Sequence, residues 1–157
     1  MRTLFLTYLL FSGLNVQAAE LNFLKAARVV KRNECYYLVL NIQNHSDRPM
    51  YFEPGDPLMD LVDQRGRKMK EIGIIANFGE LKPEDYDVVA SGNNQVKIIS
   101  LNNKFKFGIK GRYKVILSGG YYDPLHNVLY PRPELVVRFV YSGGKVVCDE
   151  LESTAFP

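Results

Sequence analysis

Few residues in this 157-residue chain have the types and spacing that catalysis or metal binding needs. The two histidines, His45 and His126, each lie beside turn residues, and no His-Glu-x-x-His, Cys-x-x-Cys or EF-hand pattern is present. The nucleophile motif Gly-x-Ser-x-Gly and the strand-to-helix glycine loop that binds phosphate are also missing from the sequence. We therefore expect no metal ion, no cofactor and no catalytic residue, and we predict that the protein is not an enzyme.

Carboxylates gather at four positions, and paired carboxylates are the groups that hydrolyse glycosides. The four residues are Glu80, Glu84, Asp85 and Asp87. They follow a Leu-Lys-Pro segment and precede an apolar run, so a polar turn before a strand accounts for them. A shorter motif, Asn44-His45-Ser46, matches the acceptor for N-linked glycans, which would matter only in a eukaryotic secretory route.

The segment from Gly119 to Pro133 is long and rich in Tyr, Pro and Gly, which predicts a surface loop. Tyrosine offers a large contact area at a small cost in side-chain entropy, so binding loops use it often. We take this segment as the candidate binding site, and the alternative is that its rings cap one end of the fold. The candidate residues are Tyr121, Tyr122, Asp123, Leu125, His126 and Tyr130.

The first eighteen residues have the order of a secretory signal peptide. Arg2 is followed by the uncharged apolar run of residues 4–14 and then by Val16-Gln17-Ala18, which suits cleavage after Ala18. The run is too short to span a bilayer. We predict a signal peptide over residues 1–18, export to a bacterial periplasm or the extracellular space, and no membrane anchor.

Charge excludes some partners. The formal net charge is +3, and it falls to +2 without Arg2, the one charged residue of the signal. Such a small excess of positive charge does not favour nucleic acid as a partner. Nothing in the sequence points to an oligomer, so we expect a monomer by default. The local basic run Lys104, Lys106, Lys110, Arg112 and Lys114 alternates with apolar residues, which predicts a solvated strand face.

The only two cysteines are Cys35 and Cys148. In an oxidising compartment one disulfide is the expected state, and it would tie an early strand to the last one. The alternative is two separate buried thiols.

The elements that must position these residues are short strands separated by Gly, Pro, Asn and Asp clusters. The clearest runs from Cys35 to Gln43, where period two places Tyr36, Leu38, Leu40 and Ile42 on one face. The other predicted strands cover residues 21–30, 50–52, 58–63, 86–90, 95–101, 112–118, 134–141 and 145–149. The last two would form a hairpin around Gly143-Gly144, with Phe139 opposite Cys148.

About eight or nine strands over residues 19–150 predict an all-β domain, an immunoglobulin-like antiparallel sandwich of two sheets, followed by a tail over residues 151–157. Tyr113, at the start of a late strand with Val115 two positions on, fits a tyrosine corner, although an ordinary strand aromatic would also explain it. The chain has no Trp, so the Cys–Trp–Cys core of antibody domains is absent.

From Tyr37 to Leu117 the order of these features follows a known pattern. A strand ends in the turn Asn44-His45-Ser46-Asp47, a short aromatic strand and a Gly-Asp-Pro-Leu turn come next, and the segments Leu61–Arg67, Glu84–Gly92 and Gly111–Val115 complete it. This half of the chain resembles the non-catalytic β-sandwich domain of deuterolysin-type (aspzincin) metalloproteases. It is similar, more loosely, to the bacterial intracellular proteinase inhibitor domain. The protease domain and its His-Glu-x-x-His are missing, so the resemblance implies a domain that contacts another protein, and no catalytic residue carries over.

These observations predict an exported, non-enzymatic domain that binds a protein partner, as a protease inhibitor, a chaperone-like protein or an immunity factor. The alternative is a sandwich that binds carbohydrate or another small ligand, since tyrosine rings also stack on sugars, or an unrecognised hydrolase.

Overall fold

The computed structural model describes residues 24–52, 57–72, 82–118, 120–123, 128–131 and 134–151. The predicted signal peptide and the tail beyond Leu151 lie outside these ranges. Within them the protein is an all-β fold made of antiparallel strands. None of the helices found in the described ranges is long and apolar enough to cross a membrane.

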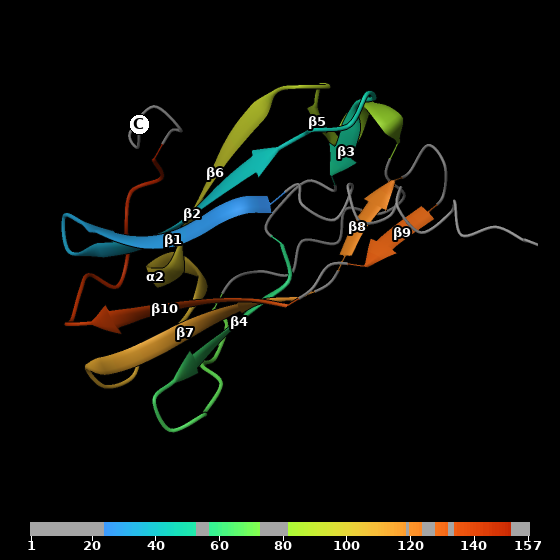
Figure 1. The fold of residues 1–157 in the computed structure, drawn as a ribbon. Helices are drawn as coiled ribbons and strands as arrows, with labels where there is room; N and C mark the ends of the chain where they lie inside the picture. The colour runs from blue at the N-terminus through green and yellow to red at the C-terminus, as the bar shows by residue number, and fades with distance from the viewer. Residues whose placement is uncertain are drawn as a thin grey trace, which may run out of the picture.

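Two three-stranded sheets face each other in this fold (Figure 1). The first has the order β1-β2-β6, and the second has the order β10-β7-β4. Their strands are β1 (Leu24–Arg32), β2 (Cys35–Gln43), β6 (Asn94–Ser100), β4 (Met59–Asp63), β7 (Gly111–Leu117) and β10 (Leu135–Tyr141). If β5 is taken as strand D and β3, β8 and β9 as insertions, these are strands A, B and E on one sheet and G, F and C on the other, which is the immunoglobulin arrangement. The predicted fold class is confirmed.

Four shorter strands and two short helical turns complete the described elements. Strand β3 pairs with β5, and β8 pairs with β9. Their bounds are β3 (Met50–Phe52), β5 (Asp87–Val89), β8 (Gly120–Asp123), β9 (Val128–Pro131), the 3-10 turn η1 (Pro83–Asp85) and α2 (Leu101–Lys104). The described part of the chain thus holds ten strands, against the eight or nine predicted.

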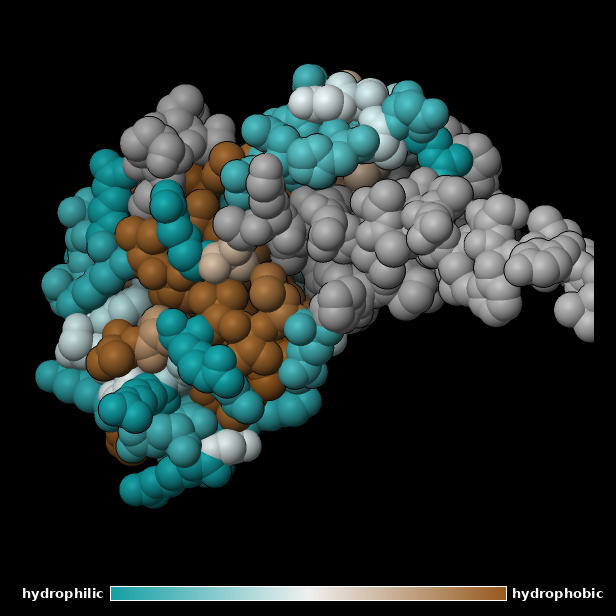
Figure 2. Space-filling model, viewed as in Figure 1, coloured by the Kyte–Doolittle hydropathy of each residue, from teal (hydrophilic) through white to brown (hydrophobic). Residues whose placement is uncertain are grey.

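The core lies between the two sheets and follows the period-two pattern of the strands. From β2, Tyr36, Leu38 and Leu40 are buried on the inner face, as predicted. Strand β7 opposes them with Tyr113, Val115 and Leu117, which are also buried. Figure 2 shows apolar side chains gathered between the sheets, with hydrophilic ones on the lower side, where β4 and β7 lie. Burial of each such side chain contributes roughly 1.5–3 kcal/mol, which makes this interface the main source of stability.

Two predicted strand assignments are wrong. The basic run from Lys104 to Lys114 is not one strand face, because only Arg112 and Lys114 lie in β7, while Lys104 ends α2 and the others lie between these elements. Residues 145–149 do not form a last strand, so Phe139 is not paired with Cys148. Instead the chain leaves β10 and crosses to the first sheet (Figure 1).

Tyr113 forms the tyrosine corner that was one of its two predicted roles. Its hydroxyl donates a 2.7 Å hydrogen bond to the backbone oxygen of Ile109, four residues upstream and just before β7 begins. Burial raises the pKa of this phenol, so the hydroxyl keeps the proton that it donates. The bond fixes the corner where the chain passes from the first sheet, through α2, into the second.

Replacing Tyr113 with Phe should lower the free energy of unfolding by about 1 kcal/mol, since the ring still packs but the hydrogen bond is lost. Urea unfolding of both proteins measures the difference. Tyr141→Phe is a control of the same chemistry in the same aromatic cluster. An equal loss in both variants would contradict a special role for the corner.

Candidate functional site

The tyrosine-rich segment contains two paired β-strands where the sequence predicted an irregular loop. Strands β8 and β9 pair over four positions, from Gly120 opposite Pro131 to Asp123 opposite Val128. Tyr and Val favour extended backbone, and this preference outweighs the Pro and Gly residues that suggested a loop. The hairpin therefore presents its residues at fixed ladder positions.

The pairing of β8 with β9 divides the predicted binding residues between the two sides of the hairpin. Tyr121 lies directly opposite Tyr130, so the two positions share one side of the hairpin, and Asp123 belongs to the same side by alternation. Tyr122 lies opposite Leu129 on the other side. The two remaining candidates, Leu125 and His126, lie outside the described residues.

The hairpin is an insertion in the connection between β7 and β10, strands F and G of the sandwich. At the same end, β3 belongs to the connection between β2 and β4, strands B and C, and β3 lies against β8. Figure 1 shows both two-stranded pairs together at one end of the two sheets. In immunoglobulin variable domains the B–C and F–G connections form part of the antigen-binding end.

Asn44 connects the turn after β2 to β5 at this end of the sandwich. Its side chain is fully buried, and its amide donates to the backbone oxygens of Arg48 and Val89, both at 2.8 Å. Its side-chain oxygen accepts from the backbone N–H and the hydroxyl of Ser46, which closes the turn after β2. Because both amide hydrogens are used inside the fold, the Asn44-His45-Ser46 motif offers no accessible glycan acceptor in the folded protein. The sequence located the turn, but only the fold shows that it joins β2 to β5.

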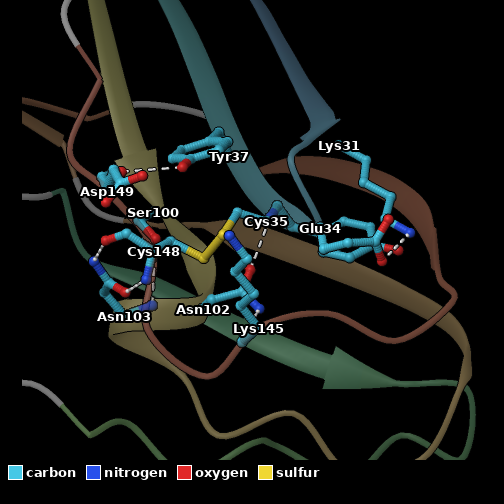
Figure 3. Close-up of a disulfide and its surroundings, with 11 residues drawn as sticks. Lys31, Glu34, Cys35, Tyr37, Ser100, Asn102, Asn103, Lys145, Cys148 and Asp149 are labelled. Atoms are coloured by element: carbon cyan, nitrogen blue, oxygen red, sulfur yellow. Dashed lines mark hydrogen bonds and ion pairs between the residues drawn. A yellow bond between two sulfur atoms is a disulfide. The ribbon is translucent and has the colours of Figure 1, made fainter.

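The opposite end of the sandwich is closed by the predicted disulfide between Cys35 and Cys148 (Figure 3). Cys35 begins β2 in the first sheet, and Cys148 follows β10 of the second sheet by a short irregular segment. Both cysteines are buried against Tyr37, whose hydroxyl donates to the backbone oxygen of Asp149. The disulfide indicates an oxidising location outside the cytoplasm.

Two asparagines that the sequence analysis missed bind the crossing segment (Figure 3). Asn102, which is 3% exposed, accepts from the backbone N–H of Tyr36 and donates to the backbone oxygen of Lys145. Asn103 bonds both the N–H and the oxygen of Cys148, each at 2.8 Å. Irregular backbone near a core needs such partners, and two adjacent asparagines after a strand are the only signal in the sequence.

Gly143 and Gly144 explain why no final hairpin forms. Gly143 has a φ of 99°, in the region that favours glycine. At Gly144 a side-chain carbon would clash with the backbone oxygen of Glu34, so the chain passes the β1–β2 turn at a distance that only glycine allows. The next amide, from Lys145, then donates to that same oxygen instead of pairing with β10.

A buried carboxylate fixes the turn after β4. Asp63 accepts from the backbone N–H groups of Arg65 and Arg67 and forms a 2.7 Å ion pair with the Arg67 guanidinium. Burial alone raises the pKa of Asp63, but the hydrogen bonds and the Arg67 charge outweigh it and hold the pKa below its usual value.

None of the described residues forms a group of three or more His, Cys, Asp or Glu side chains placed to hold a metal ion. Of the four acidic residues considered for glycoside chemistry, Asp85 accepts from the backbone N–H of Lys82 and Asp87 lies 3.9 Å from Lys97, while Glu80 falls outside the described residues. No protein-family model matches the chain, and no curated protein matches it significantly.

The double substitution Cys35→Ser and Cys148→Ser should lower the free energy of unfolding by about 4–5 kcal/mol, because the disulfide closes a loop with a sequence separation of 113. Urea unfolding measures the loss, and reduction of the wild-type protein is the matched control. Intact mass after alkylation without reduction checks the bond itself, and two alkylated thiols would contradict it.

Because the folded-state pKa of Asp63 is lowered, its contribution to stability is present above the unfolded-state value and is lost as the pH falls through the folded-state value. We expect Asp63→Asn to unfold at a lower temperature than wild type at pH 7, with the difference shrinking towards pH 3. Thermal unfolding across this range measures it. Asp60→Asn removes an exposed ion pair with Lys68 and should change little at any pH. Parallel pH profiles for wild type and Asp63→Asn would contradict the assignment.

Proposed function

We propose that this protein is an exported, non-enzymatic immunoglobulin-like domain that binds a protein partner through the end of the sandwich that carries the β8–β9 hairpin. The observation that supports it most is the insertion of this hairpin in the F–G connection, beside β3 of the B–C connection. Binding residues act best on segments that a rigid frame positions, and here the frame is two packed sheets.

The composition of the hairpin supports protein binding. Tyr121 and Tyr130 share one side of the ladder, and tyrosine is enriched among the residues that dominate binding energy at interfaces. A paired hairpin also has less conformational freedom to lose on binding than a loop of the same length, which favours affinity.

Export to a periplasm or the extracellular space is the second part of the proposal. It rests on the signal-peptide pattern of residues 1–18 and on the disulfide, which persists in oxidising compartments. The resemblance to the non-catalytic domain of deuterolysin-type proteases agrees with a role in contacting another protein.

The triple substitution of Tyr121, Tyr122 and Tyr130 by Ser should reduce capture of the partner at least tenfold, since each lost ring removes contact area at the interface. The immobilised protein is incubated with extracytoplasmic extract from its own host, and bound proteins are compared by quantitative mass spectrometry. Thermal unfolding of each variant shows whether the sandwich is intact.

The matched control is the double substitution of Val146 and Val147 by Ser at the opposite end. These side chains are 78% and 76% exposed, so their loss also removes apolar surface but should leave capture unchanged. If the folded tyrosine variant captures the same proteins in the same amounts as wild type, the hairpin is not the binding site.

A further inference from the structure

A second surface, on the outer face of the β10-β7-β4 sheet, has features that the hairpin does not explain. Alternation turns Tyr113 inward, so Arg112 and Lys114 of β7 face outward. On β10 the same alternation turns Arg138 and Val140 outward, and Val140 is 64% exposed. We call these four residues the cationic face.

The register sets two like charges side by side. Lys114 lies directly opposite Arg138, and Val140 lies opposite Arg112, so the three cations occupy adjacent positions on two paired strands. Like charges in directly opposed positions destabilise a sheet. An acidic residue at one of these two positions would replace the repulsion by an attraction.

The nearby carboxylates do not neutralise these cations. Asp60 pairs with Lys68 and Asp63 pairs with Arg67, each at 2.7 Å. Within the part of the chain that the structure describes, no ion pair is formed by Arg112, Lys114 or Arg138. Their charges are therefore available to a ligand.

The surface is also hollowed. A shallow depression of about 930 Å³ runs over the cationic face and is bordered by Gln64 and Gly66 of the turn after β4. Its lining combines the three cationic groups with the exposed apolar side chain of Val140, and it also includes Asp63, whose carboxylate is paired with Arg67. That combination suits a polypeptide that carries both carboxylates and apolar side chains.

We propose that the cationic face binds an acidic, extended polypeptide segment of a partner protein. Alternate residues of one strand lie about 7 Å apart, so Arg112 and Lys114 match carboxylates at alternate positions of an extended segment. Arg138 can contact the same carboxylate as Lys114 because directly opposed Cβ atoms are only about 5 Å apart. Val140 then meets an apolar residue of the segment.

A peptide fits this surface better than a long polyanion. Nucleic acids and sulfated polysaccharides are bound along extended basic tracks, whereas the cationic face holds three charges on two strands, in a chain whose formal net charge is only +3. The cationic face lies on a sheet face and not at the hairpin end. Its role in binding is therefore tested independently of the proposed function.

The test uses fluorescence anisotropy with a labelled peptide in which Glu and Val alternate, and the full folded protein. We expect binding that weakens as NaCl rises from about 0.05 to 0.5 M. Arg138→Glu should weaken binding at least tenfold. The same substitution should raise the unfolding temperature by about 2–4 °C, because it converts a like-charge pair with Lys114 into an opposite-charge pair.

The control Arg28→Glu makes the same charge change at an exposed position of β1, in the other sheet, and should leave peptide binding unchanged. A peptide with Gln in place of Glu should not bind. The proposal is overturned by undetectable Glu-Val binding, by equal binding of the Gln peptide, or by unchanged binding to Arg138→Glu. Tighter binding of a sulfated oligosaccharide or an oligonucleotide would also overturn it and would identify a polyanion site. If the triple tyrosine variant loses the peptide, the peptide binds at the hairpin and the cationic face is wrongly assigned.

Discussion

The covalent link between Cys35 and Cys148 joins the two sheets at one end, and the rest of that end is arranged around the segment that the link holds. Residues 142–147 leave the second sheet without forming a strand, so their backbone groups need partners from elsewhere. The backbone oxygen of Glu34 and the side chain of Asn102 supply them, and Asn103 does the same for Cys148. The disulfide therefore depends on these contacts for its position, and the contacts depend on the disulfide to keep the segment in place.

The two ends of the sandwich are built differently. At the disulfide end the chain is tied to both sheets, and Tyr36 contributes a buried ring and a hydroxyl that bonds Ser142. At the other end the connections are long and contain their own strand pairs, β3–β5 and β8–β9. The proposed binding residues lie on connections that leave the two sheets, which is where binding residues are commonly carried.

The inner and outer faces of the second sheet differ in how they contribute to stability. Inside, Leu61, Val115 and Leu117 are fully buried and pack closely, so little can vary there. Outside, Lys114 and Arg138 face each other across the ladder at a cost to stability. The tightly packed inner face and the disulfide stabilise the sheet, and the opposed cations on its outer face lower that stability.

The sequence by itself determined the all-β class, the long β2 strand and the inward positions of Tyr36, Leu38 and Leu40, because alternation is a local property that burial of one face imposes. It also indicated the disulfide, since only two cysteines exist, and it offered the tyrosine corner as one of two readings of Tyr113. The non-covalent contacts that join distant segments could not be predicted from the sequence. Asn102 resembles any polar residue after a strand, and Gly143-Gly144 resembles a hairpin turn, until the fold brings Glu34 against them. Likewise, the pairing of Lys114 with Arg138 exists only in the register between β7 and β10, which the packing of the whole sheet decides.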